Sequence, residues 1–272
     1  MSEYRQRMFR ITIWGVNGQP IPLSRPGIDR EGIFLREVPD GLQGFAKKHM
    51  WDEASGTWRG IAPQINDMTL DLHVKGGDIR GGVNRILDAL GDGSKPVSIC
   101  ITSAEFGHRW LEMRMSKVSQ IDWGQNPGSS AYAKFSVVLE LSGSTAKRFK
   151  ERIVLTQAGP FGAVQIPVDG DQDVWPKFIV SGQHSGVKIR LTDKDDWQTV
   201  PHRADGWVID SHPARRSVTN LAGLPDFSQV VPFWPEPIPV DGNRGTIQIE
   251  VDAPGPDFRL EIEWQPEMSR AW

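Results

Sequence analysis

Apolar and polar residues alternate over three separate segments of the chain, 9–14, 68–75 and 132–141. Successive side chains of a strand point to opposite faces, so this pattern predicts strands with one buried and one exposed face. In the second segment the apolar face consists of Met68, Leu70, Leu72 and Val74. Turn residues such as Pro-Asp-Gly at 39–41 end the shorter runs. The first half of the chain is therefore predicted to be mainly β.

One segment has the periodicity of a helix. Apolar residues recur at helical spacing between positions 79 and 90, at Ile79, Val83, Ile86, Leu87 and Leu90. Asp78 can cap the N-terminus of this helix, and Gly91 can end it. We predict a single helix near 79–90.

The composition changes between residues 155 and 168, where a basic stretch is followed by a Gly-Pro-Gly-rich one. Beyond it only short alternating runs occur, which predict strands near 175–181, 186–192, 206–210, 214–220, 245–252 and 257–265. Regular short strands separated by turn residues are typical of a β-sandwich. A chain of 272 residues also exceeds the commonest domain size. We predict two domains, 1–158 and 159–272.

Charge and cysteine usage narrow the classes of function. The net charge of -3 gives no strongly basic field for a nucleic-acid partner. The single cysteine, Cys100, lies in an apolar strand-like run and can form no disulfide within the chain. No segment has the length and apolarity of a signal peptide or membrane span. We expect folding in a reducing cytoplasm and no membrane insertion.

Catalytic and metal-binding motifs are weak throughout. Asp169, Asp171 and Asp173 alternate as at the start of a calcium loop, but valines occupy the required glycine and glutamate positions. The six histidines form no HxxxH or HxH pair, and the Gly-rich 76–82 segment lacks a phosphate-loop ending. Glu261 and Glu263 alternate along a strand, as on a solvated outer face. We expect no enzyme activity, metal or cofactor, with a hydrolase as the least supported alternative.

Eleven tryptophans are the chain's most unusual compositional feature. Trp is favoured both in cores and at interfaces. Trp207 and Trp264 lie in alternating strand patterns, which predict burial. Trp51 and Trp58 lie instead in a loosely patterned segment, 45–60, which is predicted to be a loop. These two are therefore the better candidates for a protein interface.

Several stretches of the second half resemble siphophage distal tail proteins and minor tail proteins of phages that infect actinobacteria. The stretches are DGDQDVWPKFIVSGQHSGVKIRL (169–191), GWVIDSHPARRSV (206–218), PFWPEPIPVDGNRGTIQIEV (232–251) and FRLEIEWQPEMSRAW (258–272). In the first half the order of strands and one helix is compatible, without a short diagnostic motif. The resemblance is therefore carried by residues 165–272.

This resemblance implies a β-sandwich-like N-terminal ring domain with one helix and a galectin-like C-terminal β-sandwich. The subunits would form a hexameric ring that joins the tail tube protein to the tail-tip hub protein, and DNA would pass its channel without specific binding. The protein would be made in the host cytoplasm and located in the virion, at the tail tip. We expect the subunit interface at Lys47, Lys48, Trp51 and Trp58, together with the 25–37 segment.

A carbohydrate-binding tail module that contacts the host cell wall is the main alternative. The polar loop 193–206 contains one aromatic residue among hydrogen-bonding groups, as a shallow sugar site requires. Asp195, Trp197 and His202 are the candidate saccharide contacts. An ordinary solvated loop explains the same residues, and we favour that interpretation.

Overall fold

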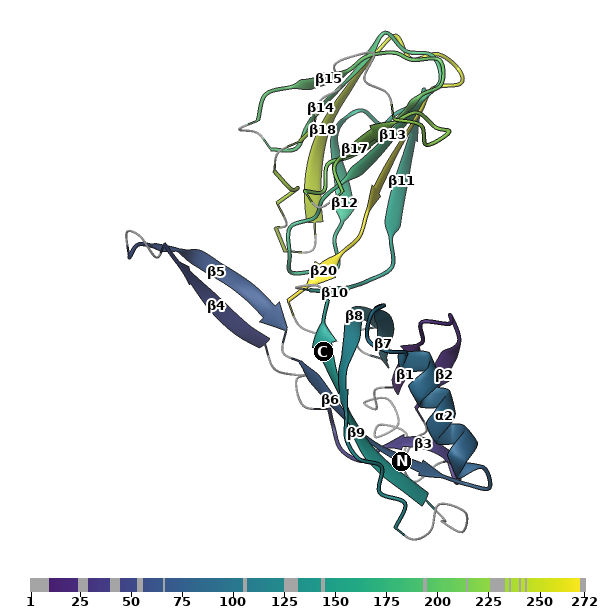
Figure 1. The fold of residues 1–272 in the computed structure, drawn as a ribbon. Coiled ribbons are helices and arrows are strands. Elements are labelled where there is room, and N and C mark those ends of the chain that lie inside the picture. The colour runs from purple at the N-terminus through teal and green to yellow at the C-terminus, as the bar shows by residue number, and fades with distance from the viewer. Residues whose placement is uncertain are drawn as a thin grey trace. The chain divides into compact units, whose positions relative to one another are not determined.

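The computed structural model describes most of residues 10–269. The described ranges are 10–23, 29–39, 45–52, 56–65, 67–104, 107–124, 132–142, 145–192, 195–213, 215–225, 233–234, 236–239, 241–242 and 244–269, without the side chains of 45–50 and 59–65. Strands dominate these residues, which contain one helix, as the sequence predicted (Figure 1). The chain forms two compact units, Met1–Lys147 with Met268–Trp272, and Arg148–Glu267.

The first unit is built on a nine-stranded sheet. Its main path runs β2 (Pro20–Pro22), β1 (Arg10–Trp14), β7 (Val97–Ser103), β8 (Gly107–Val118), β9 (Tyr132–Leu141), β6 (Met68–Lys75) and β3 (Gly32–Leu35). Each neighbouring pair along this path is antiparallel. Two short strands, β10 (Ala146–Lys147) and β20 (Glu267–Met268), pair with each other, and β10 also pairs with β8.

Both ends of this sheet bury side chains in one core. Ile13 from β1 and Ile33 from β3 belong to the same buried cluster, although β1 and β3 lie near opposite ends of the strand order. The sheet must therefore curl around that cluster. The alternation predicted over 68–75 is confirmed, because Met68, Leu70, Leu72 and Val74 are all buried.

The helix α2 (Ile79–Leu90) packs on this core, and its predicted limits are confirmed. The Asp78 carboxylate accepts a hydrogen bond from the backbone N–H of Gly81 at 2.8 Å, as a helix cap does. Near the other end, the backbone N–H of Val16 donates to the carbonyl of Ala89 at 2.8 Å. The helix is thus attached to the loop that follows β1.

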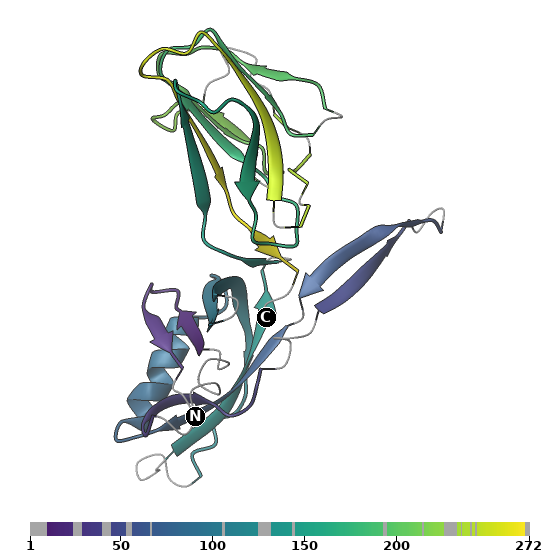
Figure 2. The same cartoon turned by 180° about the vertical axis from the view of Figure 1, so that it is seen from behind.

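The segment predicted as a loop over 45–60 is a β-hairpin, so that prediction was wrong. β4 (Phe45–Trp51) and β5 (Trp58–Ile65) pair antiparallel, and among the described residues neither strand pairs with a third (Figures 1 and 2). The alternation that reveals a strand comes from having one face on a core. A hairpin that forms only a two-stranded sheet of its own has less need of such a face, which explains the loose sequence pattern.

The second unit consists of two sheets with a shared core. One has the order β11 (Glu151–Thr156), β19 (Arg259–Trp264), β13 (Lys177–Ser181), β16 (Trp207–Asp210) and β17 (Ser217–Thr219); the other has β12 (Gly162–Pro167), β18 (Arg244–Asp252), β14 (Gly186–Arg190) and β15 (Gln198–Val200). Phe178 and Ile262 of the first sheet and Ile189 and Ile249 of the second are completely buried in one cluster. Two sheets packed through such a core make a β-sandwich.

Two strands of this sandwich, β11 and β12, lie in or next to residues 155–168, where the composition of the sequence suggested a domain boundary. β11 pairs with β19, and β12 pairs with β18, so both belong to the second unit. The second unit therefore begins at Arg148, upstream of the proposed division at 158/159. The Gly-Pro-Gly stretch that suggested a domain boundary lies in the turn between these two strands.

Candidate functional site

The end of the β4–β5 hairpin presents two tryptophans to solvent. Trp51 and Trp58 are register partners across the hairpin, and their exposed fractions are 60% and 51%. The turn that joins them is held by the backbone N–H of Asp52, which donates to the Thr57 carbonyl at 2.8 Å. Gly56 has φ +63, a conformation that glycine adopts without strain. Strand register and local turn chemistry therefore place both tryptophans at opposed, exposed positions.

The tryptophans predicted to be buried behave differently. Trp207 and Trp264 have exposed fractions of 0% and 3%. Their indole N–H groups donate to the carbonyls of Pro201 and Pro167, at 2.9 and 3.0 Å. Exposure thus separates Trp51 and Trp58 from these core residues, in the direction that the strand patterns predicted.

The other predicted interface residues are placed only in part. Lys47 and Lys48 lie on β4 opposite Pro63 and Ala62, and their side chains fall outside the described residues. In the 25–37 segment, 25–28 also fall outside them, while the remainder contains β3. β3 is an end strand of the nine-stranded sheet and pairs with β6 alone among described strands. An end strand offers backbone hydrogen-bonding groups to a partner chain.

Each candidate saccharide contact of the 193–206 loop has a different neighbour. The Asp195 carboxylate accepts a hydrogen bond from the backbone N–H of Thr192 at 2.9 Å, within its own turn. The Trp197 ring is 36% exposed, and the Arg190 guanidinium lies 4.9 Å from its centre. His202 is exposed and lies edge-on to His184, with ring centres 5.1 Å apart. The sequence prediction for these three residues remains untested.

His184 is the most buried histidine of this region. Its exposed fraction is 5%, and its ring also packs edge-on against Phe258, with centres 5.7 Å apart. Burial, and then the neighbouring His202, lower the pKa of the imidazole below 6.5. Its Nδ1 atom has no hydrogen-bond partner within the described structure. The neutral ring is therefore the form that this environment favours.

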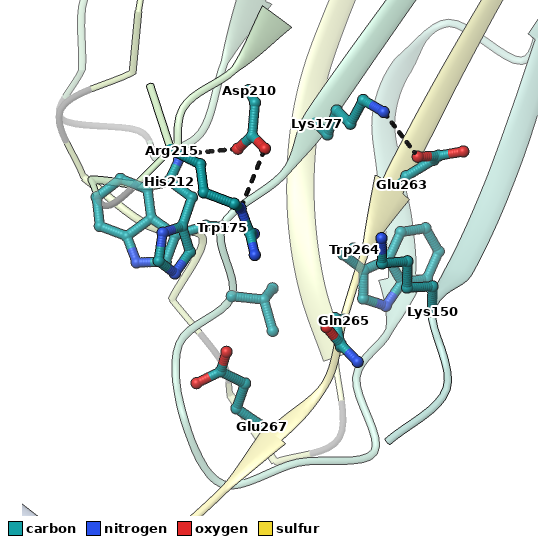
Figure 3. A pocket seen from close by; sticks show the side chains of 11 residues that line it. Lys150, Trp175, Lys177, Asp210, His212, Arg215, Glu263, Trp264, Gln265 and Glu267 are labelled. Carbon is teal, nitrogen blue, oxygen red and sulfur yellow. Dashed lines mark hydrogen bonds and ion pairs between the residues drawn. The ribbon is translucent and has the colours of Figure 1, made fainter. Parts of the chain in front are cut away.

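A cavity of about 170 Å³ opens on the five-stranded sheet of the second unit (Figure 3). Strand register explains why its residues meet, because Lys177 of β13 pairs with Glu263 of β19 on one side and with Asp210 of β16 on the other. The Lys177 ammonium lies 3.5 Å from the Glu263 carboxylate. Residues far apart in sequence thus form one row of alternating charge on the outer face.

The loop after β16 completes the wall of this cavity. The Asp210 carboxylate accepts hydrogen bonds from the backbone N–H of His212 at 3.0 Å and from Nε of Arg215 at 3.3 Å. The Trp175 and His212 rings are 6.1 Å apart at 62° (Figure 3). Sequence reasoning missed this cavity. The sequence held one indication of the cavity, the outward position of Glu263 on a predicted strand. That position is confirmed, but it does not reveal which strands lie beside Glu263.

Two further features concern metal binding and membrane crossing. Within the described ranges, no three His, Cys, Asp or Glu side chains gather closely enough to hold a metal ion. The described helix is too short and too polar to cross a bilayer.

Similarity to solved structures extends over both units. Neither a protein-family model nor a curated protein sequence matches this chain. The crystal structure of the phage SPP1 Dit protein, described as a paradigm of the hub adsorption apparatus in phages that infect Gram-positive bacteria, matches with a TM-score of 0.52. That match covers 96% of this chain and 99% of the SPP1 protein, at 10% sequence identity. The chain has a Dit-like fold.

Chains from the phage P2 baseplate show the same fold. The activated baseplate with Ca matches with a TM-score of 0.52 and 9% identity, over 97% of this chain and 99% of the other. The activated baseplate with Sr matches over the same shares, with a TM-score of 0.50 and 9% identity. The resemblance to distal tail proteins noted for residues 165–272 is thus confirmed at the level of the fold.

Proposed function

We propose that the chain is a structural, non-enzymatic protein of a phage tail, of the distal-tail type. Its work is assembly: a ring, hexameric by the resemblance, that joins the tail tube to the tail-tip hub and adsorption apparatus. The observation that carries this proposal is the Dit-like fold, which extends over 96% of the chain and nearly all of the SPP1 protein. In the virion, DNA passes through the channel of the ring without specific binding.

The contacts that close the ring are proposed at the β4–β5 hairpin and at β3. A ring needs a heterologous interface, in which two different patches of each subunit meet head to tail. Trp51 and Trp58 supply one patch, because large exposed aromatic side chains are the usual anchors of protein interfaces. The edge of β3 that pairs with no described strand, within the 25–37 segment, supplies the other. Lys47 and Lys48 lie on the same hairpin and contribute charge to the contact.

The oligomeric state of the purified full-length chain tests this function. Light scattering on a sizing column should give a species of six times the 30.4 kDa of one chain, with negative-stain images of a closed ring. The measurement is repeated up to the highest concentration at which the protein stays in solution. A monomer throughout that range, with the native fold intact by circular dichroism, would contradict self-assembly.

A further inference from the structure

The cavity of the second unit is lined mainly by polar side chains whose charges balance. The cationic groups are Lys150, Lys177 and Arg215, and the carboxylates are Asp210, Glu263 and Glu267. Three cations and three carboxylates leave no net charge to select an ion. Equally, so many charged groups do not suit an apolar ligand, whose burial would desolvate them. The lining therefore favours a neutral, strongly polar ligand.

The polar groups of the wall are held in place yet keep hydrogen-bonding capacity. Ion pairing with Lys177 fixes Glu263, and the His212 and Arg215 contacts fix Asp210. A carboxylate accepts about four hydrogen bonds, an ammonium donates three and a guanidinium five, so each group retains positions for a ligand. Donors and acceptors alternate along the row. A hydroxyl group both donates and accepts, which makes a polyhydroxylated ligand the best match.

One wall of the cavity is aromatic and its floor is apolar. The Trp175 and His212 rings are half-buried and stand against each other. Val174 and Trp264, with exposed fractions of 1% and 3%, also line the cavity. An aromatic face beside hydrogen-bonding groups complements a sugar ring, which has C–H groups on its faces and hydroxyls around its rim.

We propose that this cavity binds one neutral sugar ring, with Trp175 as its stacking platform and the row of Glu263, Lys177 and Asp210 as its hydrogen-bonding wall. Its volume of about 170 Å³ lies below the roughly 300–1,000 Å³ of sites that enclose drug-sized ligands. The site therefore takes a single terminal residue of a glycan. This activity goes beyond assembly and does not require the ring.

Ligand-observed NMR and calorimetry on the full-length protein test the site. The probes are methyl glycosides of glucose, galactose, mannose, N-acetylglucosamine and N-acetylgalactosamine, with methyl glucuronide and glycerol 3-phosphate as anionic comparators. For a ligand of this size we expect saturable binding of at least one neutral glycoside with a Kd on the order of 1 mM. Trp175→Ala should weaken it at least tenfold, and Trp175→Phe should weaken it less.

Three further variants keep the result decisive. Lys150 is exposed and ion-pairs with no described residue, so Lys150→Ala should fold normally and weaken binding a few-fold, even where Trp175→Ala proves unstable. Trp14→Ala is the matched control, because it removes a partly exposed tryptophan of β1 that does not line the cavity, and it should leave the affinity unchanged. Trp197→Ala distinguishes this cavity from the 193–206 loop, where the sequence placed the alternative saccharide contacts.

The proposal is overturned when no neutral glycoside binds the native protein, even at glycoside concentrations well above the expected millimolar Kd. It is also overturned when an anionic comparator binds more tightly than every neutral one, or when Trp197→Ala abolishes a binding that Trp175→Ala preserves. These readings are independent of ring formation, so failure here is separate from failure of the assembly function.

Discussion

Truncation of Trp51 is the sharpest test of the proposed subunit interface. A tryptophan buries about 150–250 Å² when enclosed. With 60% of Trp51 exposed in the subunit, an interface can cover roughly another 90–150 Å² of it. At about 25 cal/mol per Å² this corresponds to about 2–4 kcal/mol for each subunit contact. Trp51→Ala should therefore weaken each contact by roughly 30- to 1,000-fold, at 1.4 kcal/mol for each factor of ten.

The same change should leave the subunit folded. Trp51 is exposed on a hairpin that pairs with no third described strand, and exposed substitutions usually alter the free energy of unfolding by about 0.5 kcal/mol or less. A dilution series on a sizing column with light scattering measures the concentration at which rings dissociate. Thermal unfolding followed by circular dichroism checks the fold. Both experiments use the native protein, Trp51→Ala, Trp58→Ala and the Trp197→Ala control.

Rings that dissociate at much higher concentration in Trp51→Ala than in the native protein support the interface. Trp58→Ala should also weaken the ring. The double variant should lose less association free energy than the sum of the two single variants, because the two residues are register partners. Dissociation of Trp51→Ala at the same concentration as the native ring refutes the reasoning. So does an equal effect of Trp197→Ala, which would indicate a general response to lost tryptophan.

Three further predictions concern the stability of the subunit. Asp78→Ala removes the cap on Gly81 and should cost about 1 kcal/mol of unfolding free energy, measured in urea. Gly182→Ala should cost at least about 2 kcal/mol, because φ is +77 and a Cβ would collide with the Asp257 backbone carbonyl. For His184, whose pKa is lowered by burial, stability should fall as pH drops from about 6.5 through the lowered pKa, because only the unfolded chain takes up the proton. His184→Phe should remove that part of the pH dependence.

Each of these predictions has a matched comparison. Gly223 has a similar φ of +80 but open space around its Cβ position, so Gly223→Ala should cost only the backbone strain, about 1–2 kcal/mol. Equal losses at Gly182 and Gly223 would show that the close carbonyl is irrelevant. Asp88→Ala, on the exposed face of α2, should change stability far less than Asp78→Ala. A pH profile unaltered by His184→Phe would assign the acid sensitivity to other groups.

Elements with one buried face were predictable from the sequence. The strand at 68–75 and the helix at 79–90 each present one face to the same core, and that burial imposes period 2 or period 3.6 on the residues. The short strand β15 was missed. Three residues are too few to establish a period, and its identity depends on pairing with β14, which the sequence does not show.

Surface features were less predictable because they depend on register. The exposure of Trp51 and Trp58 followed from the weak pattern around them, although that pattern hid the hairpin itself. The cavity beside Trp175 depends on the pairing of β19, β13 and β16, whose members come from widely separated parts of the chain. Local periodicity gives the face that a residue occupies, but it does not give its neighbour on the next strand.

The chain enters and leaves the second unit at adjacent points. The backbone N–H of Arg148, at its start, donates to the carbonyl of Pro266, near its end, at 3.0 Å, and the Gln265 amide donates to the Arg148 carbonyl at 2.8 Å. The first unit is correspondingly made of two stretches, with Met268–Trp272 following the whole second unit. This arrangement allows the sandwich to be exchanged as one piece. A recombination event that exchanges the residues between Lys147 and Met268 replaces the whole sandwich at two junctions that already lie side by side. The same event leaves the hairpin, β3 and α2 of the first unit unchanged.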